Sequence, residues 1–284
     1  MRYIPATILL ALLPFTLLAV TISSTSLNTS NGLPDNNVRS IVSDSRGFLW
    51  LGTPEGAYRY DGYFFDTYRH TGNGAHNLLV SNHFNRILQV DSLHLLCCHP
   101  NRQYSLFDLG TDHFVEAADS LKQKLYQQVM TSPYSVVLPD SLQQVVNNQG
   151  NIIYDNLWNP VVVSNNGKVW HIDRKSHLAV MLQVFDPHLF ALTQSHKYKV
   201  ITLPERQITL VSTNGCGITL YDHRNKEIQH ITASGGLIDT DYIIDMCADI
   251  NDNIWVAEEF HGLRKLSFED RKSEVILLDR DASE

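Results

Sequence analysis

Histidine and cysteine are the residue types in this chain that could ligate a metal ion, and they are densest between positions 94 and 99. The sequence contains 13 histidines and 4 cysteines, and the dense group is His94, Cys97, Cys98 and His99. A zinc site needs four ligands that converge on one point. On a β-strand, His94 and Cys98 would face one side while Cys97 and His99 face the other. The spacing therefore predicts no metal site, and no cofactor is expected.

The cysteines do not form a disulfide framework. Cys97 and Cys98 are adjacent, so their side chains point to opposite faces and cannot easily join. A bridge between Cys216 and Cys247 is conceivable, but buried free thiols are the favoured interpretation.

Catalytic motifs are absent from the sequence. It has neither H-E-x-x-H nor G-x-S-x-G, which carry zinc hydrolase and serine hydrolase chemistry. The Asp249–Asn253 turn resembles a calcium loop in composition, but the closing Glu of an EF-hand is missing. No catalytic, cofactor-binding or metal-binding residue is predicted, and the chain is not expected to be an enzyme.

Composition excludes one class of partner. The formal net charge is −8 and the isoelectric point is about 5.9, whereas nucleic-acid binding needs a surplus of Lys and Arg. We therefore expect no nucleic-acid partner.

The elements that would position these side chains come as a repeat. A stretch from Gly32 returns in altered form from Gly236, and both copies have an apolar strand, a polar turn, a strand with Trp and a second turn. Weaker copies lie between them. The shared repeat positions are Asp44, Gly47, Trp50, Gly52, Gly56, Trp170, Gly217, Asp249, Trp255 and Gly262.

The spacing of the copies predicts a β-propeller. The anchor residues of the five units are Trp50, Leu96, Trp170, Leu210 and Trp255. Three of the four spacings are about 40–46 residues, as expected for four-stranded blades. The long spacing covers 116–159, which we interpret as an insertion or an eroded blade, with a short amphipathic helix predicted over 117–130. The fold class is therefore all-β, with about five blade units of four-stranded antiparallel sheet.

The first copy resembles the opening blade of the two-component regulator propeller family. The matching residues are Gly32, Leu33, Val38, Ile41, Asp44, Gly47, Trp50, Gly52, Thr53, Gly56, Tyr60, Asp61 and Gly62. The family forms the N-terminal periplasmic sensor of hybrid two-component histidine kinases that control polysaccharide use. Because the family is built from sets of seven blades, the resemblance implies that five units form an incomplete ring from a truncated version of a longer sensor.

The N-terminus predicts export. Residues 4–20 are apolar apart from two threonines and follow a single arginine, as in a secretory signal. We assign 1–24 to a signal peptide and 31–284 to the partial propeller, and expect a periplasmic location. The run is short for a membrane span, although an uncleaved anchor is a weaker alternative.

The leading functional hypothesis, implied by the resemblance, is a ligand-sensing module that detects oligosaccharides without a kinase or output domain of its own. It could also pair with another sensor chain. A protein-interaction scaffold, or less favourably a glycan lyase or hydrolase, is the alternative. Trp50, Trp170 and Trp255 are expected to pack between blades, and Tyr63, Phe64 and Tyr68 to belong to the core. Trp158, outside the repeat, is the one weak candidate for ligand contact, by stacking on a sugar ring.

Overall fold

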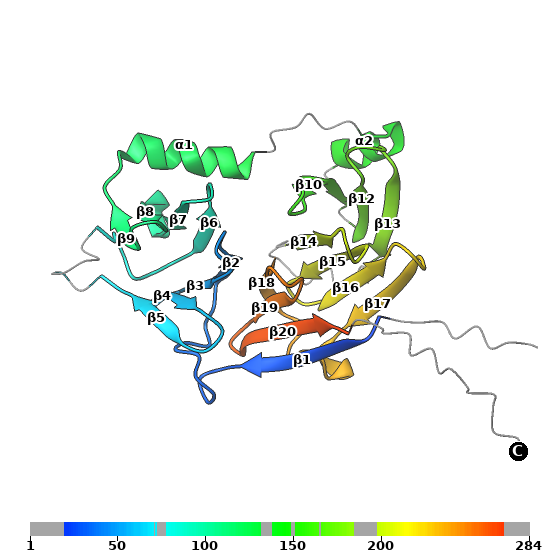
Figure 1. Cartoon of the computed structure of the whole chain (residues 1–284). Coiled ribbons are helices and arrows are strands. Elements are labelled where there is room, and N and C mark those ends of the chain that lie inside the picture. Colours follow the sequence, from blue (N-terminus) through cyan, green and yellow to red (C-terminus); the bar gives the residue numbers. More distant parts are fainter. Residues whose placement is uncertain are drawn as a thin grey trace, which may run out of the picture.

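The computed structural model describes residues 20–70, 72, 78–131, 138–148, 151–164, 166–184 and 198–269, and Figure 1 shows five separate sheets arranged around a centre. Each sheet has four antiparallel strands, which confirms the predicted β-propeller. We call the sheets blades 1 to 5. In blades 1 to 4 the strands follow chain order from the inner to the outer edge.

The strand bounds follow the repeat. Blade 1 contains β2 (Ser40–Ser43), β3 (Leu49–Thr53), β4 (Gly56–Tyr60) and β5 (Phe65–Tyr68). Blade 2 contains β6 (Arg86–Gln89), β7 (His94–Cys98), β8 (Tyr104–Asp108) and β9 (His113–Val115), with a 3-10 turn, η1 (Pro100–Arg102), between β7 and β8. Blade 3 contains β10 (Asn151–Tyr154), β11 (Pro160–Val163), β12 (Lys168–Ile172) and β13 (Ala179–Val184). Blade 4 contains β14 (Tyr198–Leu203), β15 (Ile208–Thr213), β16 (Ile218–Asp222) and β17 (Glu227–Ile231). Blade 5 contains β18 (Ile243–Ala248), β19 (Ile254–Glu258), β20 (Gly262–Phe268) and β1 (Ile22–Leu27), and the 3-10 turn η2 (Ala233–Gly235) precedes it.

Blade 5 is completed by the N-terminal strand. β1 pairs with β20 from Ile22 opposite Phe268 to Leu27 opposite Leu263, so both ends of the described chain meet in one sheet. The predicted start of the propeller at position 31 is therefore wrong, because β1 lacks the turn signals of the repeat and is recognisable only by its partner. Residues 1–19 of the predicted signal peptide lie outside the described residues, and residues 22–24 belong to β1.

The ring is open between blades 2 and 3. Inner strand β2 packs against β6 on one side and β18 on the other, while β14 packs against β18 and blade 3 contacts blade 4. The blades therefore follow the order 2-1-5-4-3, and Figure 1 shows blades 2 and 3 facing each other across the opening. The predicted incomplete ring is confirmed, but its opening falls in the middle of the chain.

Four apolar clusters join neighbouring blades. Buried side chains of blades 1 and 2 form one cluster, and blades 5 and 1, 4 and 5, and 3 and 4 form the others. These contacts remove the apolar faces of the sheets from water, which is the main stabilising term at such interfaces.

Two helices cover the blade faces at the opening. Helix α1 (Asp119–Met130) places Leu125 and Tyr126 against the free face of blade 2. Helix α2 (Asp140–Asn147) places the buried Leu142 against Val162 and Ile172 of blade 3. The predicted helix over 117–130 is thus found as α1. The rest of the predicted insertion, 116–159, is not an eroded blade, because it holds α2 and then β10, the first strand of blade 3.

Removing the apolar contact of α2 should destabilise the open end of blade 3. We expect Leu142→Ala to lower the free energy of unfolding by about 2 kcal/mol, at the small end of values for buried leucines, because α2 is covered on one side only. Chemical denaturation followed by tryptophan fluorescence measures it, with the exposed Gln143→Ala as the matched control. Equal stability of the two variants would show that α2 does not cover the blade.

Polar contacts link four inner strands around the centre. The backbone N–H of Ile87 on β6 donates to Ser40 Oγ on β2 at 3.1 Å, and Ser40 Oγ donates to Asp245 Oδ2 on β18 at 3.3 Å. Asp245 also accepts the Ile41 N–H and pairs with Lys199 of β14 at 3.2 Å. A register shift in β18 between Ile243 and Asp245 accompanies this arrangement. These bonds satisfy backbone groups that inner edge strands would otherwise leave unpaired.

Candidate functional site

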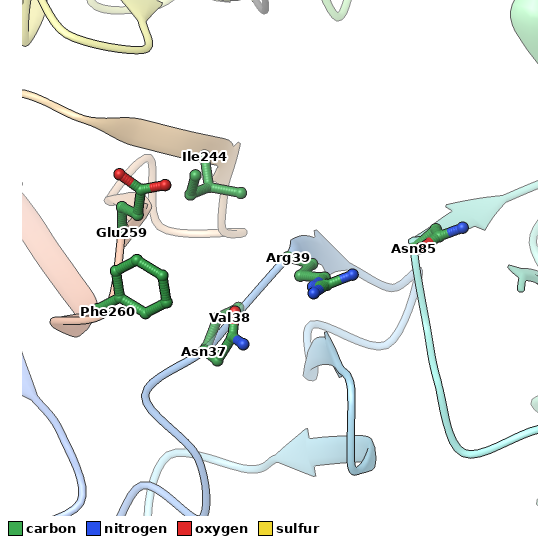
Figure 2. Close-up of a pocket in the computed structure, with 7 residues that line it drawn as sticks. All are labelled: Asn37, Val38, Arg39, Asn85, Ile244, Glu259 and Phe260. Carbon is green, nitrogen blue, oxygen red and sulfur yellow. The ribbon is translucent and has the colours of Figure 1, made fainter. Parts of the chain in front are cut away.

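A pocket of about 330 Å³ opens where blades 1, 2 and 5 meet, and Figure 2 shows its lining. The residues come from four separate segments of three blades and include two amides, one guanidinium, one carboxylate and one aromatic ring: Asn37, Val38, Arg39, Asn85, Ile244, Glu259 and Phe260. Its size lies at the lower end of the range for small-ligand pockets, which begins at about 300 Å³.

The blade topology explains why these residues converge. Residues 37–39 immediately precede inner strand β2, and Asn85 immediately precedes inner strand β6. Glu259 and Phe260 form the turn between β19 and β20 of blade 5, and the Glu259 N–H donates to the Tyr242 carbonyl at 3.0 Å. The pocket therefore lies at the end of the ring where the inner strands begin.

The cation of the pocket is held by a histidine. Arg39 Nη1 lies 2.6 Å from Nε2 of His83, which is in the loop before β6. A guanidinium can only donate, so His83 accepts through Nε2. The His83 carbonyl in turn lies 2.9 Å from His99 Nδ1, and the buried His99 bonds Ser105 Oγ through Nε2 at 3.0 Å. Burial lowers the pKa of His99, which fits a neutral imidazole in this position.

Most polar side chains of the pocket have unused hydrogen-bonding capacity. Within the described part of the chain, the side chains of Asn37, Asn85 and Glu259 have no hydrogen-bond or ion-pair partner. Phe260 is 69% exposed. Amide, carboxylate and guanidinium groups beside an exposed ring suit a ligand with many hydroxyl groups and an apolar ring face.

Asp44, Gly47, Trp50, Asp249 and Trp255 have a structural role at the turns that follow the inner strands, away from the pocket. Asp44 accepts the N–H groups of Arg46 and Phe48 through Oδ1 and the Trp50 Nε1–H through Oδ2 at 2.8 Å. Asp249 repeats this, with Trp255 Nε1 at 3.0 Å. Gly47 occupies the left-handed turn position at φ 88°. Gly52 lies within β3, Gly56 and Gly262 begin β4 and β20, and Gly217 precedes β16.

Trp170 is a correction to the repeat alignment. It lies on β12, the third strand of blade 3, whereas Trp50 and Trp255 lie on second strands. The counterpart of Asp44 is Asp155, whose Oδ1 accepts the Leu157 and Asn159 N–H groups at 2.8 Å each. Both hairpins of a blade share the strand-turn-strand pattern, so the spacing alone could not tell them apart.

Trp158 belongs to the turn that Asp155 caps. It has φ 64° at the position of Gly47, and its ring packs on Tyr154 at 5.7 Å between centroids. A left-handed tryptophan is a rare backbone conformation. Because this turn follows inner strand β10, while the pocket residues precede β2 and β6, Trp158 does not line the pocket. Its predicted ligand contact remains a prediction without support from the pocket.

Asp155 has partners that Asp44 lacks. Its Oδ2 accepts from His171 Nε2 at 2.9 Å and from Thr202 Oγ1 of blade 4 at 2.6 Å. These hydrogen bonds lower the pKa of Asp155 although burial opposes them. Thr202 also contacts Thr209 Oγ1 at 3.2 Å, and Thr209 contacts His223 Nε2 at 2.9 Å. This Asp155 network joins blades 3 and 4, and sequence spacing did not reveal it because it crosses between blades.

The expectation for the aromatic residues of the outer strand of blade 1 is corrected in part. Tyr68 is buried as expected, but Tyr63 and Phe64 are 85% and 76% exposed at the tip of the β4–β5 turn, so assigning them to the core was wrong.

Cys97 and Cys98 are buried free thiols as favoured, and Cys216 and Cys247 are also unbridged. Burial raises the pKa of Cys98 to about 11, so it is not a reactive thiolate. Among the described residues no His, Cys, Asp or Glu cluster could hold a metal ion, and no helix is long and apolar enough to span a membrane.

Comparisons with known proteins found structural matches at low sequence identity. No curated protein matches the sequence. The extracellular domain of a putative hybrid two component system of B. thetaiotaomicron is 16% identical, with 87% of this chain and 42% of that chain covered and a TM-score of 0.49. The extracellular domain of a putative one component system from the same organism is 15% identical, covering 83% and 28%, with a TM-score of 0.31. Streptogramin B lyase is 12% identical, covering 84% and 67%, with a TM-score of 0.32.

The chain spans less than half the length of the two extracellular domains that it resembles. Its sequence matches a model of the two component regulator propeller family at residues 32–55, which cover the first turn and strand pair of blade 1. The resemblance drawn from the repeat is confirmed there, and residues 32–55 are a two component regulator propeller repeat.

Proposed function

We propose that this chain is the ligand-binding propeller of an extracellular sensor and that it binds an oligosaccharide in the pocket between blades 1, 2 and 5. The observation that carries the proposal is the pocket lining, in which Asn37, Asn85 and Glu259 have unused hydrogen-bonding groups and Phe260 exposes its ring. Sugar hydroxyls both donate and accept hydrogen bonds, so amides and a carboxylate match them, and a pyranose face matches an aromatic ring. An exported, periplasmic location belongs to this proposal.

The position of the pocket is suited to sensing. It is bounded by segments of three blades, so a bound ligand contacts parts of the ring that are far apart in the sequence. Ile244 of its lining is next to Asp245, which links blades 1, 4 and 5. Ligand binding would therefore bias how the blades pack around the centre, which is the kind of change a sensor can pass on.

Phe260 provides the direct test. We expect oligosaccharide at about 100 times its Kd to raise the melting temperature by roughly 5–10 °C. We expect Phe260→Ala to weaken binding about 3- to 10-fold through loss of ring stacking. Thermal denaturation measures the melting temperature. Isothermal titration calorimetry with panels of neutral and acidic oligosaccharides measures the affinity of the unmodified chain and of Phe260→Ala. Tyr63→Ala is the matched control, because it removes an exposed ring from the β4–β5 turn of blade 1, away from the pocket.

The test also separates the alternative functions. A scaffold without a sugar ligand would show no shift with any glycan and no difference between the Phe260 and Tyr63 variants. A lyase or hydrolase would release new reducing ends or unsaturated products from the glycan, which chromatography detects. Pairing with a second sensor chain stays a prediction, and light scattering of the purified chain would measure it.

A further inference from the structure

We propose that the ligand of this pocket carries an anionic group, a carboxylate or a sulfate on a sugar ring, and that the Arg39 guanidinium binds it. The inference rests on the proposed function, and it specifies the chemical class of the sugar. It follows from the charge state and the contacts of Arg39.

Arg39 is a half-buried cation without a counter-charge. Within the described residues, the one hydrogen-bond partner of its guanidinium is the ring of His83, and no carboxylate pairs with it. Two other half-buried arginines do pair with carboxylates, Arg59 with Asp66 and Asp112 and Arg206 with Asp252. Partly burying a charge is costly unless an opposite charge or hydrogen bonds compensate. An anionic ligand would supply the missing partner.

The His83 contact positions Arg39 without neutralising it. His83 accepts from Nη1 and leaves the other N–H groups of the guanidinium for a ligand. The loop that carries His83 is held in place by the buried His99, whose Nδ1 lies 2.9 Å from the His83 carbonyl oxygen. A guanidinium held in this way can offer two parallel N–H groups to a carboxylate or sulfate, the geometry in which arginine binds oxyanions best.

The charges at the two ends of the pocket determine the orientation of the bound ligand. Figure 2 shows Arg39 and Asn85 toward one end of the pocket and Glu259 with Phe260 at the other. Glu259 would repel an anion placed beside it but would accept hydrogen bonds from sugar hydroxyls. The arrangement therefore favours an acidic group at the Arg39 end and a neutral ring on Phe260.

The test compares charged and neutral forms of one sugar. Trigalacturonate and its methyl ester share the ring hydroxyls and differ in charge, and a sulfated disaccharide separates sulfate from carboxylate. Calorimetry is done with the full chain and with Arg39→Gln, Arg39→Lys and Arg224→Gln. The last variant removes the same charge from a guanidinium that pairs with Asp222 on blade 4. Inorganic sulfate serves as the test for a bare anion.

We expect an acidic sugar to bind at least 10-fold more tightly than its neutral form. Arg39→Gln should lose about 10- to 100-fold in affinity, Arg39→Lys should lose less because the charge remains, and Arg224→Gln should bind like the unmodified chain. Equal binding of the acid and the ester, unaffected by Arg39→Gln, would overturn the inference and leave the sugar-binding function intact. Binding of inorganic sulfate as tightly as of any sugar would reduce the site to a bare anion site. If neither neutral nor acidic sugars bind, the proposed function fails as well.

Discussion

Replacing Trp50 with alanine is expected to lower the free energy of unfolding by about 3–5 kcal/mol, the range for a fully buried aromatic residue. Trp50 is 1% exposed, and its ring lies 4.9 Å from that of Tyr68 and 4.8 Å from that of Phe107 in blade 2. The substitution would also leave the buried Asp44 without its indole donor, which adds to the loss. Urea denaturation followed by circular dichroism measures the effect.

Trp170→Ala is the matched control for this prediction. Trp170 is only half-buried beside α2 at the open end of the ring, so its loss should cost less than half as much as that of Trp50. Equal effects at the two positions would mean that Trp170 does occupy an anchor position between blades, in conflict with its place on β12.

Replacing Asp155 with alanine should lower the free energy of unfolding by about 3–4 kcal/mol. The Asp155 network would lose the acceptor for His171, Thr202 and two backbone N–H groups, and each buried donor left unpaired costs about 1–3 kcal/mol before relaxation. Asp155→Asn keeps one acceptor oxygen, so it should lower the free energy of unfolding less than Asp155→Ala does. Asp61→Ala is the matched control, because Asp61 accepts two backbone N–H groups in an exposed turn. We expect it to lower the free energy of unfolding far less than Asp155→Ala does.

The Asp155 network should also make stability depend on pH. The pKa of Asp155 is lowered in the folded chain, so its contribution to stability is complete above the ordinary carboxyl pKa near 4 and is lost as the pH falls through the folded pKa.

Burial, and then the nearby His171, lower the pKa of His223. The unfolded chain then binds a proton more readily, so stability falls as the pH drops below about 6.5. Unfolding at pH 7, 5.5 and 4 should show a smaller decline for His223→Gln, and an unchanged pH profile would show that His223 does not titrate with folding.

The sequence determined the blade type because a blade is a local structure. Each turn needs a residue such as Asp44 to satisfy backbone N–H groups and one such as Gly47 to take a positive φ, and both requirements recur at fixed spacing. The helix at 117–130 was likewise predicted from its own periodicity.

Tertiary structure decided what depends on contacts between distant segments. Strand β1 joins blade 5 only through pairing with β20, and the ring opens between blades 2 and 3 because α1 and α2 cover the apolar faces there. Trp170 was misplaced because both hairpins of a blade follow the same local rules, and only the sheet order separates them. The pocket combines Arg39, Asn85 and Phe260 from three blades, and no spacing in the sequence relates residues that meet through the packing of separate sheets.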